Sequence, residues 1–134
     1  MDFEAKIAEL GLLIPKPAKP AGSYKPCVIV DNIAYISGQG PLLEDGSFAK
    51  GKVGEGIDLE TAQDHAKLCG LAILSALKNE VGSLNKVDQL IKLTGFVNCS
   101  ENFTQQPLVI NGCSNMMKDI FGEVGVHARA AVGV

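Results

Sequence analysis

The order of helical and β-prone segments predicts an α+β fold, a mixed β-sheet with two long helices on one face and a short helix at the N-terminus. Three observations predict it. Segments 58–79 and 107–121 repeat apolar residues at helical spacing, short β-prone runs lie before, between and after them, and 46% of the residues are hydrophobic. A chain of 134 residues with this composition forms one core, so we expect a single domain over 1–134.

The N-terminal 19 residues predict a short helix followed by a connector. Phe3, Ile7 and Leu10 fall on one helical face, Asp2 is a suitable cap, and Gly11 ends the helix over 2–10. Three prolines then follow within residues 15–20, and this density excludes both a helix and a central strand. Residues 1–19 are therefore interpreted as a helix with a proline-rich, extended connector.

A β-hairpin is predicted next, over 27–30 and 33–37. The two β-prone runs are separated only by Asp31 and Asn32, which both tolerate positive φ. The glycine-rich stretch 41–56 predicts a turn and a mobile loop, with a marginal extra strand around 47–50.

The segment 58–79 is the clearest helix, with Asp58 as its N-cap and Gly82 as its stop. Its expected apolar stripe is Ala62, Ala66, Cys69, Ile73, Ala76 and Leu77. A long β-prone run over 87–99 predicts a strand. Pro107 suits the first position of the second helix, 107–121, whose stripe is Val109, Cys113, Met116, Met117 and Ile120. Residues 127–134 predict the last strand.

Composition excludes several function classes. A net charge of −3 offers no basic surface for RNA or DNA, and no apolar run approaches the roughly 20 residues of a membrane span. The first residues do not form a secretory signal. Four cysteines without a CxxC pair, beside only two histidines, predict no metal site, and we expect no cofactor. The cysteines are interpreted as reduced core thiols of a cytoplasmic protein.

Arg129 is the only arginine, and it lies inside the last predicted strand. A guanidinium group is the side chain best suited to bidentate contact with a carboxylate or phosphate. Strand alternation places His127, Arg129, Ala131 and Gly133 on one face, which we interpret as the floor of a small-ligand site. The other face (Ala128, Ala130, Val132 and Val134) is expected to belong to the core. Alternatively, Arg129 pairs with a carboxylate at an edge or subunit contact.

Other candidate residues each have a structural alternative. Ser37 and Gly38 begin a Ser-Gly-Gln-Gly-Pro segment that either binds an anion or carbonyl through its backbone or is simply a turn. Tyr24 either lines a pocket or anchors a surface loop. Asn111 is a ligand contact or an ordinary residue near a helix start. His127, on the face of Arg129, is a functional candidate or a packed histidine.

These segments occur in the order of a known family. The residues that carry the likeness are the loop 22–24, the segment 36–41, Ala62 and Leu74 of the first long helix, the strand end 95–97, and the segment 128–132. Over residues 20–134 the chain resembles the Rid/YjgF family of reactive-intermediate (enamine/imine) deaminases, also labelled endoribonuclease L-PSP. The N-terminal helix and extra residues between Phe103 and Arg129 are similar to its longer subgroup.

The resemblance implies a chorismate-mutase-like fold and a homotrimer with sites at subunit interfaces. It implies a hydrolase of the 2-iminobutanoate/2-iminopropanoate deaminase type, in which Arg129 holds the carboxylate of a 2-imino or 2-enamino acid and water replaces its nitrogen. By the same resemblance, Tyr24 closes the pocket, Gly38 within the Ser37 segment offers a backbone contact, and Asn111 comes from a neighbouring region.

Two departures from the family pattern leave a second function open. Ala131 occupies the position where the family usually has a cysteine. The family chain also continues into a C-terminal strand whose glutamate positions the water, and by this resemblance that strand is missing after Val134. The alternative is a non-catalytic protein that binds a small carboxylic acid in the same pocket. The ribonuclease label is disfavoured by the charge and the single arginine.

Overall fold

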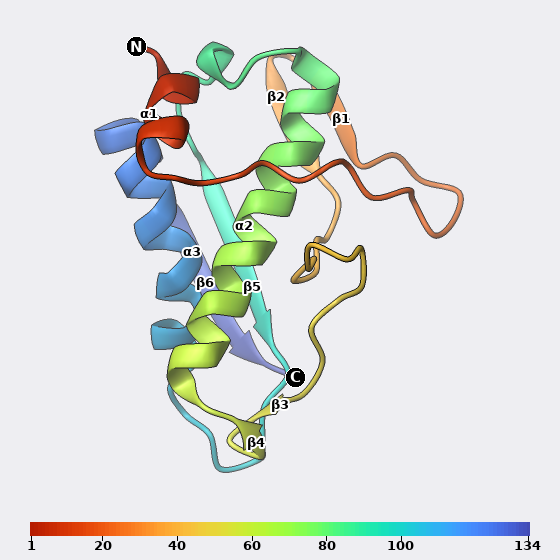
Figure 1. Ribbon diagram of the computed structural model, residues 1–134, viewed down its shortest axis with the longest axis vertical. Coiled ribbons are helices and arrows are strands. Elements are labelled where there is room, and N and C mark those ends of the chain that lie inside the picture. The colour runs from red at the N-terminus through yellow and green to blue at the C-terminus, as the bar shows by residue number, and fades with distance from the viewer.

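The two long helices pack against each other on one side of the strands in the computed structural model, which describes all 134 residues (Figure 1). Helix α2 spans Leu59–Val81 and helix α3 spans Gln106–Phe121. The predicted caps of α2 are confirmed: the Asp58 carboxylate accepts a 2.8 Å hydrogen bond from the Thr61 amide, and Gly82 ends the helix at φ +88°. None of the helices combines the length and apolar character needed to cross a membrane.

The predicted hairpin is confirmed. Strand β1 (Cys27–Val30) pairs antiparallel with β2 (Ile33–Ile36). Asp31 and Asn32 form the connection at φ of 50° and 63°. These are the positive dihedrals that a two-residue hairpin turn requires, and Asp and Asn adopt them more readily than most other residues. The hairpin contacts α2 rather than α3.

The last two strands are parallel and are joined through α3. Strand β5 (Lys92–Val97) pairs with β6 (Ala128–Gly133), with Leu93 opposite Arg129 and Gly95 opposite Ala131. A parallel pair needs a crossover connection, and α3 supplies it while covering one face of the pair. Two short strands, β3 (Lys52–Val53) and β4 (Gly56–Ile57), form a third pair. Hydrogen bonding thus divides the strands into three two-stranded units.

Two predicted strand boundaries are wrong. The run 87–99 forms a strand only over β5, because Leu84–Lys86 form a short 3-10 helix and Val87 and Leu90 pack against the core instead. The marginal strand at 47–50 is reduced to a single bridge between Leu42 and Phe48. A second 3-10 turn, Gly122–Gly125, follows α3.

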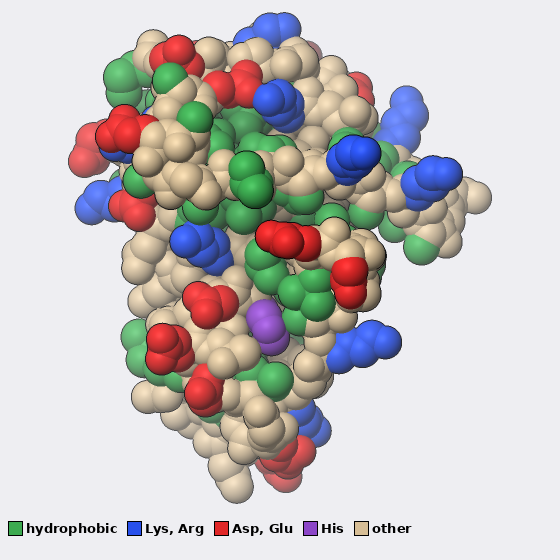
Figure 2. All heavy atoms as spheres, viewed as in Figure 1, with side chains coloured by type: hydrophobic (Ala, Val, Ile, Leu, Met, Phe, Trp, Pro, Cys, Tyr) green, Lys and Arg blue, Asp and Glu red, His purple; other side chains and the backbone are tan.

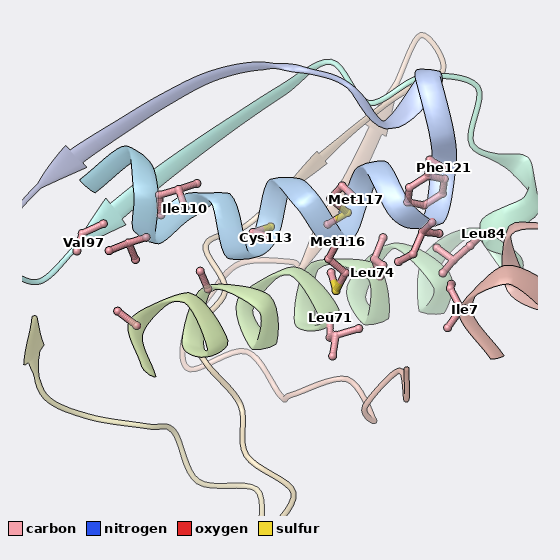
Figure 3. Close-up of a cluster of buried hydrophobic side chains, with 14 of the residues drawn as sticks. Ile7, Leu71, Leu74, Leu84, Val97, Ile110, Cys113, Met116, Met117 and Phe121 are labelled. Atoms are coloured by element: carbon pink, nitrogen blue, oxygen red, sulfur yellow. The ribbon is translucent and has the colours of Figure 1, made fainter. Parts of the chain in front are cut away.

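The main core lies between α2 and α3 and extends to the strands and to α1 (Phe3–Glu9). Figure 3 shows Leu74, Cys113 and Met116 between the two long helices, with β5 and β6 on the other side of α3. The predicted stripe of α3 is buried throughout. At one end of the core, the ring centroids of Phe3 and Phe121 lie 4.8 Å apart in an edge-on arrangement.

The predicted stripe of α2 is only partly correct. Ala62, Ala66 and Ala76 are buried, but Cys69, Ile73 and Leu77 are half-buried, while Gly70, Leu71 and Leu74 are buried in addition. The cause is that α2 is covered on more than one side. Besides α3, it contacts the proline-rich connector, where the Ser75 hydroxyl donates a 2.6 Å hydrogen bond to the Pro15 carbonyl.

The two faces of β6 are the reverse of the prediction. Helix α3 covers the face that carries Arg129, and Ala131 packs against the core. The opposite face is open in the single chain, with Val132 42% exposed, Val134 68% exposed and the neighbouring Phe96 of β5 69% exposed. The predicted core set of Ala128, Ala130, Val132 and Val134 is therefore wrong. Alternation separates the two faces of a strand but does not say which one a helix will cover.

Candidate functional site around Arg129

Arg129 extends from β6 beneath the N-terminal half of α3. Its Nη1 donates hydrogen bonds to Asn111 Oδ1 at 2.8 Å and to Ser114 Oγ at 3.2 Å, and its Nη2 donates to the Pro107 carbonyl at 3.3 Å. All three partners are neutral oxygens. The chain's two ion pairs join other residues, so no carboxylate of the chain neutralises this half-buried guanidinium.

The helix places these partners by its own periodicity. Pro107, Asn111 and Ser114 are separated by four and three residues, so they lie along one face of α3, and that face meets β6. Three of the five guanidinium N–H groups are thereby used. The Nε–H and one N–H of Nη2 have no partner in the chain, and two donors are what a bidentate carboxylate takes.

A second group of hydrogen bonds continues from Ser114 to His127. The Ser114 Oγ lies 3.0 Å from Nε2 of His127, and Nδ1 of the same ring lies 2.7 Å from the Gly125 carbonyl oxygen. A carbonyl only accepts, so Nδ1 carries the proton and Nε2 of the neutral ring accepts from the serine hydroxyl. Ser114 therefore donates to the imidazole while its oxygen accepts from Arg129.

The structure does not bring every predicted site residue to Arg129 within one chain. Tyr24 is 51% exposed, and its hydroxyl accepts a 3.1 Å hydrogen bond from the Ala21 amide. The Ser37 hydroxyl donates to the Lys25 carbonyl at 2.6 Å, and a Cβ on Gly38 would meet open space. The hairpin beside them lies behind and to the right of α2, whereas α3 lies to its left (Figure 1).

Ala131 follows Arg129 on the covered face of β6, opposite Gly95. Its methyl group joins the apolar cluster and brings no polar atom to the site. The predicted residues thus form two groups in one chain: Arg129, Asn111 and Ala131 beneath α3, and Tyr24, Ser37 and Gly38 beyond α2.

Sequence reasoning missed Ser114. The available signal is its spacing, because a residue three positions after Asn111 shares its helical face. His127 was singled out for its place beside Arg129 on the strand, and it joins the same group through Ser114. The other histidine, His65 on α2, makes no hydrogen bond to a protein group.

The cysteines are unpaired, and Cys27, Cys99 and Cys113 are buried. Burial raises the pKa of Cys69 to about 11 and that of Cys113 to about 12, so both are protonated at neutral pH. No group of three or more His, Cys, Asp or Glu side chains has the arrangement of a metal site. An open hollow of about 330 Å³ beside the end of β6 is lined by other residues: Cys99, Ser100, Glu101, Phe103, Gln106, Gly133 and Val134.

Comparison with known proteins gives consistent matches over almost the whole chain. Residues 4–133 match the family model described as "YjgF/chorismate mutase-like, putative endoribonuclease". The chain is 37% identical to Protein TCP17 of Trypanosoma cruzi over 97% of this chain and 82% of that protein.

Two crystal structures are similar to the model. Protein Atu1372 of Agrobacterium tumefaciens, described as having unknown function, is 42% identical with a TM-score of 0.88, covering 98% of this chain and 80% of that one. A protein of Shewanella oneidensis described as a "putative endoribonuclease" is 28% identical with a TM-score of 0.95, covering 100% of this chain and 89% of that one.

Proposed function

Because the chain belongs to the YjgF/chorismate mutase-like family and so has its α+β fold, we propose that it hydrolyses small 2-imino and 2-enamino acids to 2-keto acids and ammonia. The observation that carries the proposal is Arg129. It is a half-buried cation held by three neutral oxygens, without a carboxylate partner and with two N–H groups free. A half-buried charge of this kind favours an anionic ligand.

The proposed role of Arg129 is to fix the substrate carboxylate. The imine carbon of a 2-imino acid is bonded directly to the carboxylate carbon, so binding the carboxylate also positions the reacting carbon. Holding two reactants in place removes much of the entropic cost of their encounter. Asn111 and Ser114 orient the guanidinium through its Nη1, which leaves other N–H groups for the ligand.

The second group of predicted residues is proposed to reach the site from another copy of the chain. Tyr24, Ser37 and Gly38 lie beyond α2 from Arg129 in one chain, and the open face of β5 and β6 is apolar. We propose a homotrimer in which Tyr24 closes the pocket, Gly38 offers backbone contact and Ala131 leaves space. Reaction in the cytoplasm agrees with four unpaired cysteines.

A ribonuclease activity has less support. The net charge is −3, and Figure 2 shows acidic and basic side chains interspersed over the helix-bearing face rather than one large basic patch. Binding a phosphate backbone depends on several Lys or Arg contacts acting together.

The proposal is tested by ammonia release from freshly generated 2-aminoacrylate. Arg129→Ala is expected to lower kcat/KM by about 100-fold or more, because the only charged contact to the carboxylate is lost. Arg129→Lys keeps the charge without the planar fork and is expected to retain part of the activity. Unchanged ammonia release by Arg129→Ala, with the folded state confirmed by circular dichroism, would contradict the proposal.

A binding role without catalysis is the second candidate. It is favoured by the absence of any carboxylate around Arg129 that could act as a base toward water. In that case pyruvate would bind to the wild type in calorimetry and not to Arg129→Ala, while neither would release ammonia above the uncatalysed rate.

A further inference from the structure

We propose that Ser114 and His127 form the proton relay of the Arg129 site. This inference rests on the proposed hydrolysis of imino acids and adds the groups that move its protons. The geometry is a continuous path from Arg129 Nη1 to Ser114 Oγ at 3.2 Å, from Oγ to His127 Nε2 at 3.0 Å, and from Nδ1 to the Gly125 carbonyl at 2.7 Å. A hydroxyl, a base and a group that orients the base are thus in hydrogen-bond contact.

The direction of the serine hydroxyl is the unusual feature. A serine inside a helix commonly returns its hydroxyl proton to the carbonyl four residues earlier. Ser114 instead directs it across to the imidazole, because Gly125 fixes the tautomer in which Nε2 accepts. The neighbouring guanidinium stabilises negative charge that develops on Oγ when the proton leaves.

The position relative to the substrate follows from the shared contact with Arg129. A carboxylate on the free N–H groups places the imine carbon one bond away from the bound group, beside the guanidinium that Ser114 also contacts. The relay is then the titratable group nearest to the reacting atoms that the hydrogen bonds of this chain define.

In the addition step, the water oxygen bonds to the imine carbon and the electron pair of the C=N π bond moves to nitrogen. Ser114 accepts the proton that water loses as its own proton passes to His127, and the reverse transfer delivers a proton to the nitrogen. The elimination step repeats the exchange. The hydroxyl proton reaches the nitrogen, the C–N bond breaks with its pair on nitrogen, and the carbonyl forms. The relay is neutral at the start and end, and imine plus water gives ketone plus ammonia.

The test compares Ser114→Ala and His127→Gln with the wild type. Glutamine retains hydrogen-bonding groups in place of the imidazole but does not take up a proton. Both variants are expected to lower kcat for 2-aminoacrylate at least about tenfold, within the usual range for loss of acid–base catalysis. KM and the affinity for pyruvate should stay within about threefold, since Asn111 and Pro107 still hold Arg129.

The double variant gives a second readout. If the two side chains act as one path, Ser114→Ala/His127→Gln is expected to lose no more activity than the more severe single variant. Losses that multiply, or a raised KM with unchanged kcat, would overturn the relay and assign the pair a role in holding Arg129. Matched controls are His65→Gln and Ser47→Ala, which lie outside this group and are expected to leave kcat unchanged.

The outcomes also separate this inference from the proposed function. Absence of ammonia release by the wild type would overturn the deaminase proposal and the relay together. Release by the wild type that is lost in Arg129→Ala but retained by both relay variants would overturn the relay alone. Loss of pyruvate binding together with turnover in Ser114→Ala would also overturn it.

Discussion

Gly112 allows the backbones of the two long helices to approach closely. A Cβ at this residue would strike the carbonyl group of Gln63 on α2, which is backbone and cannot move aside cheaply. The same crossing is bridged by the Gln63 side chain, whose Nε2 donates a 2.8 Å hydrogen bond to the Leu108 carbonyl. Because Asn111 and Ser114 flank Gly112, the helix crossing also sets the depth at which they meet Arg129.

We therefore expect Gly112→Ala to destabilise the protein. Alanine raises helix propensity by about 1 kcal/mol, but overpacking against backbone costs about 1–3 kcal/mol or more, and the net effect should be a loss of unfolding free energy in urea. Asn115→Ala, at an exposed position of the same helix, is the matched control and should be neutral or stabilising. Equal stability of the two variants would show that the helices separate without cost.

Single residues also show what sequence reasoning can reach in the candidate site. Arg129 stood out because it is the only arginine, and Asn111 followed from the family resemblance. Ser114 has no such mark, since its importance comes from packing α3 onto β6, and only that contact directs its hydroxyl toward His127. The covered face of β6 was predicted wrongly for the same reason: it is fixed by tertiary packing.

At the scale of elements, α1 is attached to the end of α2 by polar contacts as well as by Phe3 in the core. The Glu4 carboxylate accepts from Lys78 Nζ and, at 2.8 Å, from the Ser83 hydroxyl. The Glu4 amide donates to Asn85 Oδ1 at 3.0 Å. These bonds close a contact between residues that are far apart in the sequence.

This attachment is expected to weaken in acid. The side-chain hydrogen bonds from Lys78 and then Ser83 lower the pKa of Glu4, so its contribution is present above the unfolded-state pKa near 4.5 and is lost as pH falls through the folded-state value. Glu4→Gln should cost about 0.5–1 kcal/mol at pH 7, because the pair is partly exposed, and less below pH 4. Urea unfolding at both pH values measures this difference.

The control for that prediction is Glu9→Gln, which removes a 3.5 Å pair with Lys6 between two exposed side chains. Its effect should be close to zero at either pH. A loss in Glu4→Gln that is as large at pH 3 as at pH 7 would contradict the electrostatic origin assigned to the contact.

Elements with local signals were the ones predicted correctly. The Asp31-Asn32 turn and the Asp58 cap each determine local geometry through a few neighbouring residues, and both are confirmed. The strand over 87–99 was overextended because its apolar residues are also compatible with a buried irregular segment. Leu90 illustrates this: its amide donates to the Val124 carbonyl, outside any strand.

For the whole molecule, the open face of β5 and β6 is the main apolar surface left by the packing of the helices on the other side. Phe96, Val132 and Val134 lie on it, at 69%, 42% and 68% exposure. Exposed apolar patches of this kind usually mark contacts with another protein, and contact between copies is the commonest case in symmetric oligomers. The homotrimer proposed above would use this face.

Phe96→Lys is accordingly expected to shift the protein from the oligomer to the monomer in size-exclusion chromatography with light scattering. Ammonia release should fall in parallel if Tyr24 and Gly38 come from a neighbouring copy. Leu13→Lys, which changes an apolar residue that is 78% exposed on the connector, is the control and should leave the mass unchanged. An unaltered oligomer in Phe96→Lys would place the interface elsewhere.

The short sequence distance within the Arg129 group has a consequence for how the molecule folds. Its hydrogen bonds join residues only 13 to 22 positions apart, all within the contiguous β5–α3–β6 segment. Closing such short loops costs little chain entropy, and local contacts form early in folding. The guanidinium is therefore caged by its own neighbourhood before the distant hairpin docks, and the anion-binding half of the site does not depend on the first third of the chain for its geometry.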